Sequence, residues 1–464
     1  MASILFISTK SDWGGSELLW CDSAEKAYRA GHRVSAVIPQ TGELHHRHQE
    51  LEALGIRFHI RPTRMPPSLL NKIIRKYKGL KHDWEVSWWQ KNFRDKPDAI
   101  CVSQGGSYCA LWMPGLIPWL LECGVPYLVV CHSHRNYALP GSAFRGQLRK
   151  YLVGAARVCF VAAEHVRAAG RYLGVELINA IVVQNPVNLG KGGEVADGES
   201  LIADGLSQRS EDGGLGTEGC VALDDRRSKI GDRGAAALDS RLSTLDASSA
   251  LDASSALDAR PSTLDSKAPA TSYSLPATAP VALMACVARL EIRDKGQDLL
   301  LEALADPVWK KRGFRLDFYG DGPDREVLED LIKLYGLEEK VRLGGFESDI
   351  RKIWAEHELL VLPSVSEGTP ISLIEAQICD RAALVTRVDG NPEWVEEGRT
   401  GFLAEAPTVY HLRLALERAW ENRHRWREMG EAARDACLAK RNPDPAGSLL
   451  GLLCKAAKQA RADL

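Results

Sequence analysis

The chain has 464 residues, of which 45% are hydrophobic and 26% are charged, and its formal net charge is −2. This length exceeds one ordinary core and predicts two domains with additional sequence. The near-neutral charge argues against a nucleic-acid binder, which would need many Lys and Arg contacts to phosphates. The composition also excludes collagenous, coiled-coil and wholly disordered chains.

The sequence pattern carries no sign of a leader, a zinc ribbon or a redox motif. The 11 Cys residues include no Cys-x-x-Cys pair, and they indicate reduced, buried thiols of a cytoplasmic protein. The start of the chain lacks the charged segment and long apolar run of a signal peptide. Residues 109–131 are long enough to cross a bilayer, but three prolines and Glu122 favour a place in a soluble core instead.

Strand and helix patterns alternate from the start of the chain. An apolar strand at residues 3–8 is followed by a Gly-bearing loop, a helix at 17–30 and a second strand at 33–38. This is the unit of a parallel sheet. The alternation continues with predicted strands at 98–103, 127–131, 158–162 and 181–184 and predicted helices at 106–123 and 164–173. Residues 1–189 are therefore predicted to form a doubly wound α/β domain.

Residues 190–280 have a different composition, dominated by Gly, Ala, Ser, Asp and Leu. The hexapeptide LDASSA at 245–250 repeats at 251–256. A six-residue period with one Leu cannot bury the face of a sheet or helix, so the segment is predicted to be a disordered insertion. A short solenoid is the alternative, although so few degenerate copies would stack poorly.

The α/β alternation resumes at residue 281 and predicts a second doubly wound domain over 281–440, with a helix at 408–438. A C-terminal helix is expected over 441–464, and it is a candidate to pack back on the first domain. Two Rossmann-like domains in one chain imply a cleft between them, with ligands at the carboxyl ends of the strands.

The most informative segment joins a strand that ends at Leu362 to a helix that Pro370 would open. Glu367 lies in the connecting loop, and Glu375 lies about one turn inside the helix. The backbone N–H groups of Ile371 and Ser372 would point out of the helix end and stabilise an anion. Two Glu residues eight apart are often only solvated helix charges, but the loop context favours a functional role.

A second cluster, Arg289 and Lys295, follows the first strand of the second domain. Two cations near a helix N-terminus suit a diphosphate, because Arg binds it as a fork and Lys as a point charge. Ion pairing with Glu291 and Asp294 at the surface is the alternative reading.

These motifs together resemble the donor domain of family 4 glycosyltransferases, which are retaining enzymes of the GT-B fold that use nucleotide sugars. The resemblance covers nearly all of 281–440 with the motifs in family order. The first domain matches more loosely, through the glycine loop, the strand that ends at His132 and the segment 183–188. The donor-domain motifs are Arg289…Lys295-Gly296, Gly320-Asp321-Gly322-Pro323, Gly345-Phe346, Glu367-x7-Glu375 and Gly390-Asn-Pro-Glu393.

The resemblance implies a role for each matched residue. Arg289 and Lys295 would hold the donor diphosphate, and Glu375 would bond the ribose hydroxyls. Glu367 would contact the sugar as a catalytic residue, and His132 would approach it from the first domain. The remaining donor-binding residues would be Gly15, Gly368, Thr369, Pro370, Ile371 and Ser372, with Asp321-Gly322 and Gly345-Phe346 near the base.

Three features depart from the family pattern. Asp389 stands where the family often has the first Gly of a pair. His134 competes with His132, because alternation along a strand sends both side chains to one face. The insertion is much longer than the family's usual crossover, although a long flexible loop costs only logarithmically more to close than a short one.

The predicted function is metal-independent, retaining transfer of a hexosyl group from a nucleotide sugar to a glycan or lipid-linked acceptor. Fixed cations and a helix N-terminus would stabilise the leaving diphosphate, so neither a metal nor another cofactor is expected. The alternatives are another GT-B enzyme, such as an epimerase or phosphorylase, and a catalytically silent glycan-binding protein.

A basic segment at residues 69–81 combines apolar side chains at helical spacing with Lys and Arg on another face. This pattern suits a helix that lies on an anionic membrane and would place the protein peripherally on the inner face of a membrane. A solvated basic face over the core is an equally good interpretation.

Overall fold

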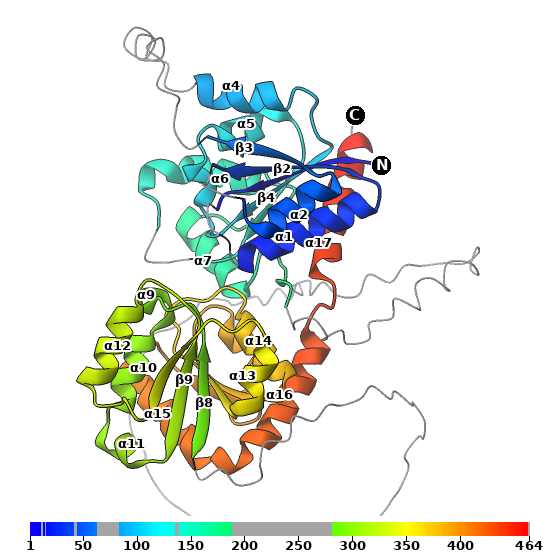
Figure 1. Cartoon of the computed structure of the whole chain (residues 1–464). Coiled ribbons are helices and arrows are strands. Elements are labelled where there is room, and N and C mark those ends of the chain that lie inside the picture. The colour runs from blue at the N-terminus through cyan, green and yellow to red at the C-terminus, as the bar shows by residue number, and fades with distance from the viewer. Residues whose placement is uncertain are drawn as a thin grey trace, which may run out of the picture. The chain divides into compact units, whose positions relative to one another are not determined.

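The structure, a computed structural model, describes residues 1–10, 13, 15–40, 44–62, 83–134, 139–187 and 281–462. The predicted basic helix at 69–81 and the predicted insertion at 190–280 lie outside the described residues. Within those residues, two parallel sheets carry the fold (Figure 1).

The N-terminal sheet has the strand order β3-β2-β1-β4-β5-β6-β7, and every neighbouring pair is parallel. The central strands are short apolar runs buried on both faces, as parallel sheets require. The strands are β1 (Ser3–Ser8), β2 (Arg33–Pro39), β3 (Arg57–Arg61), β4 (Ala99–Gln104), β5 (Tyr127–Cys131), β6 (Arg157–Phe160) and β7 (Ala180–Val182).

Helices cover both faces of this sheet, and each face has its own apolar core. One core includes residues of α4, α5, α6 and α7, and the other includes residues of α1, α2 and α17. The helices that come from the N-terminal part of the chain are α1 (Gly15–Arg29), α2 (His46–Leu54), α4 (Asp83–Asn92), α5 (Leu116–Cys123), α6 (Arg145–Val153) and α7 (Ala163–Leu173).

The C-terminal sheet has the order β10-β9-β8-β11-β12-β13, again parallel throughout. In both sheets the strand order reverses beside the first strand, between β1 and β4 and between β8 and β11. The carboxyl ends of strands at such a reversal form the crevice where α/β proteins bind ligands. The strands are β8 (Ala282–Val287), β9 (Phe314–Tyr319), β10 (Val341–Gly345), β11 (Leu359–Leu362), β12 (Ala382–Thr386) and β13 (Gly401–Ala404).

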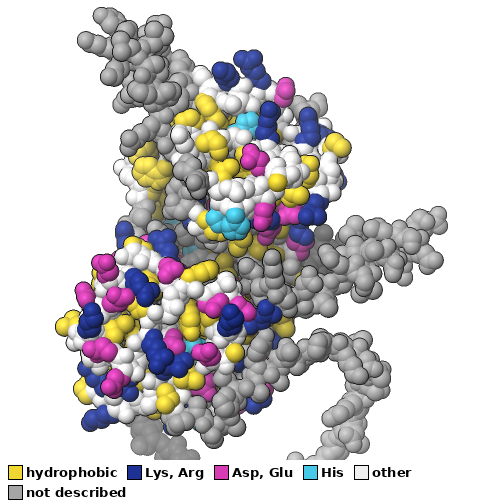
Figure 2. Space-filling model, in the orientation of Figure 1, with side chains coloured by type: hydrophobic (Ala, Val, Ile, Leu, Met, Phe, Trp, Pro, Cys, Tyr) yellow, Lys and Arg dark blue, Asp and Glu magenta, His cyan; other side chains and the backbone are white. Residues whose placement is uncertain are grey.

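The helices of the C-terminal domain also form two layers, with α10, α12 and α15 on one face and α13 and α14 on the other, while α16 contributes side chains to both cores (Figure 1). Acidic and basic side chains are interspersed over the visible face of this domain (Figure 2), as the near-zero net charge suggests. The helices are α9 (Ile292–Lys295), α10 (Gln297–Leu304), α11 (Pro307–Lys311), α12 (Arg325–Leu334), α13 (Ile350–Glu356), α14 (Ile371–Ile378), α15 (Val409–Glu421) and α16 (Trp426–Lys440).

The last helix, α17 (Pro445–Ala462), packs on the N-terminal domain. Its Leu449, Leu453 and Ala457 side chains are buried in the same core as α1. The Ser23 hydroxyl of α1 also donates a hydrogen bond to the Ala446 carbonyl (3.1 Å). The chain therefore begins and ends in one domain.

The predicted fold class, with two doubly wound α/β domains, is confirmed, but two predicted helices are wrong in detail. The helix predicted at 106–123 is divided into a 3₁₀ turn (Cys109–Trp112) and α5. Pro114 and Gly115 lie between the two pieces, and Gly115 has φ 73°, which a helix cannot contain. The helix predicted at 408–438 is likewise divided into α15 and α16. Among the described residues, no helix is both long and apolar enough to cross a membrane.

Candidate active site

Two loops at the carboxyl ends of β8 and β11 lie against each other. The N–H groups of Val365 and Ser366 donate hydrogen bonds to the Asp294 carbonyl (2.8 and 3.1 Å). Gly296 has φ 62°, and a Cβ atom there would collide with the Pro363 carbonyl. Glycine thus permits the close approach that brings Lys295, the last residue of α9, to the loop of Glu367.

Lys295 and Glu367 form the central charged pair of the site. The Lys295 Nζ atom lies 2.7 Å from Glu367 Oε1, and the Ser364 hydroxyl donates to the same oxygen at 2.7 Å. The two side chains are only 22% and 9% exposed, so water screens this pair less than a surface pair. The structure therefore brings together two of the predicted site residues.

Arg289 is in the same loop but has a different partner. Its guanidinium pairs with Glu291 at 2.7 Å, and its side chain is 55% exposed. This is the surface ion pair that the sequence left open as an alternative. An exposed pair of this kind contributes little, about 0–1 kcal/mol, so a stronger anion could displace Glu291.

The helix α14 begins directly after Pro370, as predicted, and its first two N–H groups differ in whether they have an acceptor. The Ile371 N–H donates to the Thr369 carbonyl (2.9 Å), so it is not directed at an external anion as predicted. Among the described residues, the Ser372 N–H has no acceptor. The buried Thr369 hydroxyl oxygen likewise has no partner there.

Glu375 lies inside α14 and is 9% exposed. Burial raises the pKa of its carboxyl group to about 8. The group is therefore mostly protonated near neutral pH and could both donate and accept a hydrogen bond.

The N-terminal domain contributes His132, directly after β5. Its Nε2 atom lies 3.2 Å from the Ser103 hydroxyl, while its buried Nδ1 atom has no partner among the described residues. Burial lowers the pKa of His132 to about 4, and the Asn185 side chain opposes that shift only in part. The imidazole is thus neutral near pH 7.

Two glycines mark close contacts between the domains. A Cβ atom at Gly368 would collide with the His132 carbonyl oxygen, and one at Gly15 would lie 3.0 Å from the Ile371 side chain. Gly15, His132, Gly368 and Ile371 are thereby gathered in one place, although they come from both domains. His134, the competing histidine, is buried, and its Nδ1 atom lies 3.0 Å from the Ser107 hydroxyl.

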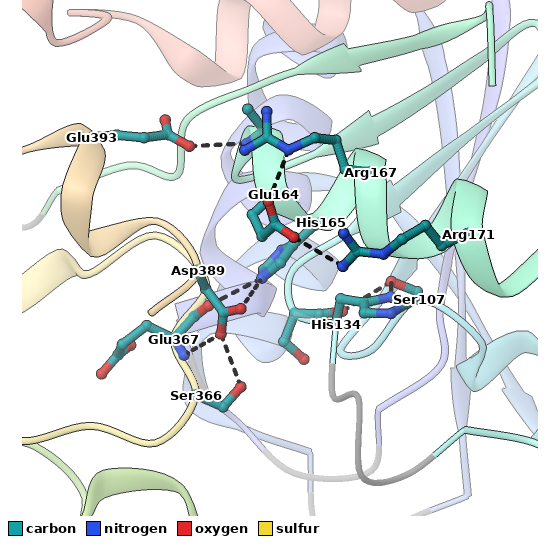
Figure 3. A network of polar contacts seen from close by, with 12 residues as sticks. Ser107, His134, Glu164, His165, Arg167, Arg171, Ser366, Glu367, Asp389 and Glu393 are labelled. Carbon is teal, nitrogen blue, oxygen red and sulfur yellow. Dashed lines mark hydrogen bonds and ion pairs between the residues drawn. The ribbon is translucent and has the colours of Figure 1, made fainter. Parts of the chain in front are cut away.

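A polar network that the sequence did not reveal surrounds Glu367 (Figure 3). Asp389, in the loop after β12, accepts hydrogen bonds from the Glu367 N–H (2.8 Å) and the Ser366 hydroxyl (3.1 Å). His165 of α7 lies 3.1 Å from the Glu367 carbonyl oxygen through its Nε2 atom. Nothing in the local pattern marks His165, because it is one buried residue of an amphipathic helix.

Comparison with known proteins matches both halves of this arrangement. The family described as Glycosyl transferases group 1 matches residues 275–436, and the Glycosyl transferase 4-like domain matches residues 14–186. The chain belongs to the group 1 glycosyltransferases.

Curated relatives of this group 1 glycosyltransferase match over a limited length. Alpha-D-kanosaminyltransferase of Streptomyces kanamyceticus is 31% identical over 34% of this chain and 41% of its own length. N-acetyl-alpha-D-glucosaminyl L-malate synthase of Bacillus anthracis is 30% identical over 26% of this chain and 32% of its own. The chain thus spans less than half the length of these relatives.

Solved structures match this chain over nearly its whole length, but their sequence identity is low, so the likeness shows the fold alone. HepE of Anabaena in complex with UDP and glucose covers 97% of this chain and 98% of its own, with 15% identity and a TM-score of 0.59. Sucrose-phosphate synthase of Thermosynechococcus elongatus covers 99% and 100%, with 16% identity and a TM-score of 0.60.

A buried carboxylate beside the glycine loop of this glycosyltransferase also escaped the sequence prediction. Glu17 accepts hydrogen bonds from the Ser8 hydroxyl (3.1 Å) and the Trp20 indole (2.8 Å). Burial raises its pKa to about 7. It fixes the start of α1 directly after Gly15. Among the described residues, no three His, Cys, Asp or Glu side chains are grouped as metal ligands.

Proposed function

We propose that the protein transfers a hexosyl group from a nucleotide sugar to a glycan or lipid-linked acceptor, with retention of the anomeric configuration and without a metal ion. The observation that carries this proposal is the partly buried contact between Lys295 and Glu367, close to the start of α14. The family membership supports the reaction class. HepE, whose structure holds UDP and glucose, supports a nucleotide sugar as donor.

The leaving diphosphate would be stabilised by positive charge fixed before the reaction starts. Lys295 lies at the site already, and Arg289 would exchange its exposed partner Glu291 for the diphosphate. The N–H of Ser372, which has no acceptor in the part of the chain that the structure describes, adds a donor at the start of α14, together with the helix dipole. Charges that are already in place stabilise the transition state strongly, because the site does not have to reorganise when the reaction occurs.

Glu375 would recognise the ribose. Burial raises the pKa of Glu375 to about 8 because the carboxylate anion is poorly solvated there. The two vicinal hydroxyls of a ribose could donate hydrogen bonds to that carboxylate and stabilise it. Ribose binding should therefore lower the pKa of Glu375.

Glu367, His132 and the Thr369 hydroxyl would contact the sugar. A neutral His132 can accept a hydrogen bond from a sugar hydroxyl through the buried Nδ1 atom that has no described partner. Gly15 and Gly368 would let the backbone approach the sugar closely, and Pro370 and Ile371 would line the same end of the helix.

Retention would follow from attack on the face that the diphosphate leaves. The bond between the anomeric carbon and the phosphate oxygen breaks, the acceptor hydroxyl forms the new bond, and its proton passes to the departing phosphate oxygen. A covalent intermediate on Glu367 is the weaker route, because Lys295 and Ser364 both hold its Oε1 atom.

The test is the Glu367→Gln variant, which keeps the shape of the side chain and removes its charge. Wild-type protein should transfer a sugar from one member of a panel of UDP-, GDP- and dTDP-sugars, and the variant should lose about 10²-fold or more in turnover. The exposed Glu421→Gln variant is the matched control. Normal turnover in Glu367→Gln would refute the assignment.

Two further measurements test the finer parts of the proposal. The coupling constant of the anomeric proton in the product, measured by NMR, should match that of the donor. Turnover should be unchanged by EDTA. An inverted product, or activity that EDTA abolishes and a divalent cation restores, would refute retention or metal independence respectively.

The lipid-linked acceptor is tested separately. If residues 69–81 form the proposed membrane-binding helix, the protein should co-sediment with vesicles that contain anionic lipid at low salt and not with neutral vesicles. Absence of co-sedimentation under those conditions would remove the membrane contact and leave a soluble glycan as acceptor.

A further inference from the structure

The peptide unit of Glu367 is held from both domains at once. Asp389 of the C-terminal domain accepts its N–H, and His165 of the N-terminal domain contacts its carbonyl oxygen (Figure 3). The side chain of the same residue is fixed separately, by Lys295 and Ser364. The backbone and the carboxylate of Glu367 therefore have independent supports.

The contact chemistry fixes the state of His165. A carbonyl oxygen only accepts, so the Nε2 atom at 3.1 Å from it carries the proton and donates. The same Nε2 atom lies 3.6 Å from Asp389 Oδ1, which favours a proton at that position. The ring is fully buried, so it has little freedom to turn away.

Asp389 holds its position at a conformational cost. It has φ 44°, in the left-handed region that non-glycine residues avoid. The family often has Gly at this position, which would adopt the same backbone without strain and without a carboxylate. Strain that persists in this way is typical of a residue whose side chain is needed there.

The two contacts differ in what they require. Asp389 binds the Glu367 loop from within the C-terminal domain. The His165 contact exists only while the two domains are together, because α7 is part of the N-terminal domain. A second cross-domain hydrogen bond runs from the N–H of Ala163, the first residue of α7, to Glu393 Oε1 (2.9 Å).

We propose that His165 and Asp389 are positioning residues that make the placement of Glu367 depend on closure of the two domains. In the closed state they clamp the Glu367 peptide, so the carboxylate meets the sugar only when the N-terminal domain is in place. This inference rests on the proposed function, since it concerns the residue that would contact the sugar.

The decisive variants are His165→Ala, which removes the donor, and His165→Gln, whose amide nitrogen can replace Nε2. We expect His165→Ala to lower kcat about 10- to 100-fold, because a small misplacement of a reacting group has an effect of that size. The donor KM should change less than kcat, since the diphosphate and ribose contacts are within the C-terminal domain. His165→Gln should recover a large part of kcat.

Asp389→Gly provides a second test that separates positioning from stability. Relief of the backbone strain at φ 44° opposes the loss of two hydrogen bonds, so the melting temperature should change little, whereas kcat should fall. Arg171→Ala is the matched control, because Arg171 lies on α7 with an exposed side chain and pairs with Glu164 on the same helix. It should behave as the wild type.

Hydrogen–deuterium exchange keeps this test independent of turnover. Backbone exchange in residues 364–371 should increase in His165→Ala and not in Arg171→Ala, with or without a nucleoside diphosphate. Unchanged exchange together with unchanged kcat would overturn the clamp while leaving sugar transfer intact. A wild type that transfers no sugar would instead refute the proposed function, and the exchange result would still show whether the clamp exists.

Discussion

The two halves of the candidate site are built in different ways. In the C-terminal half, Lys295, Glu367 and Glu375 come from two adjacent loops and one helix, and the loops are fastened to each other by backbone hydrogen bonds. In the N-terminal half, Gly15, His132 and His165 follow three separate strands. The C-terminal residues thus belong to short sequence motifs, whereas the N-terminal residues are single positions far apart in the sequence.

The halves also differ in charge. The C-terminal half holds a partly buried ion pair and an exposed Arg, which suit an anionic diphosphate. The N-terminal half presents a neutral His132, whose pKa burial lowers to about 4. One domain is therefore suited to bind the charged donor, while the other adds neutral contacts that depend on closure.

Lys295→Ala should have the largest effect, because it removes fixed positive charge from the diphosphate and leaves the Glu367 carboxylate with one donor fewer. We expect turnover to fall about 10²- to 10³-fold. Steady-state kinetics with the preferred donor measures it, and Lys333→Ala, an exposed lysine on α12, is the control. Equal activity of both variants would show that the C-terminal half does not act through charge.

Gly368→Ala should have the next largest effect, and it tests whether the halves must touch. The added Cβ atom would meet the His132 carbonyl oxygen and force the domains apart. Turnover should fall by about 10²-fold while the binding of the nucleoside diphosphate, measured by calorimetry, changes little.

Gly451→Ala, on α17 with open space around it, is the matched glycine control and should keep full activity. If Gly368→Ala retains normal turnover, the close contact between His132 and the Glu367 loop is dispensable, and turnover does not require the two halves of the site to touch there.

Glu375→Gln should change how stability depends on pH. Burial raises the pKa of Glu375 from 4.5 to about 8, so the folded state keeps a proton that the unfolded chain releases between those values. The free energy of unfolding of the wild type therefore falls as pH rises through this window. The Gln variant should lose much of that fall, an effect of a few kcal/mol at about pH 8.

Urea unfolding at pH 5 and pH 8 measures this difference, with Glu421→Gln as control. Some slope should remain in the variant, because burial raises the pKa of Glu17 in the same direction. Identical slopes in wild type and Glu375→Gln would show that Glu375 is not held protonated in the folded protein.

Arg289→Ala should have the smallest effect on the free protein and a moderate one on donor binding. Its pair with Glu291 is exposed, so the melting temperature should stay within about one degree. The donor KM should rise about tenfold if Arg289 moves to the diphosphate. An unchanged KM would leave Arg289 as a surface residue and assign the diphosphate to Lys295 and α14.

Much of the C-terminal half could be predicted from sequence because its residues are close neighbours in the chain. The strand ending at Leu362, the loop with Glu367 and the helix with Glu375 form one continuous segment, and each piece has a local signal. The prediction that the Ile371 N–H points outward was wrong, because the first turn closes on the Thr369 carbonyl. Such a local hydrogen bond depends on backbone angles that the residue types do not specify.

The partners of Glu367 could not be predicted, because they come from distant parts of the chain. His165 is 202 residues away, and no pattern in α7 distinguishes a buried histidine that contacts a loop from one that fills a core. Asp389 was visible as a departure from the family, but its role depends on the position of the Glu367 loop. The division of the helix predicted at 106–123 could have been predicted, because Pro114 and Gly115 are residues that interrupt helices.

The two doubly wound domains, the segment that carries Glu367 and Glu375 and the resemblance to the family could be predicted from the sequence, since hydrophobic periodicity and short motifs act locally. The return of the C-terminal helix to the first domain was only a candidate from the sequence, and the tertiary structure decided that α17 packs there beside α1 and that His165 contacts the Glu367 loop. Both contacts depend on which helix and loop surfaces meet in three dimensions. The pattern of side chains along one helix shows which face is buried, but not which element covers it.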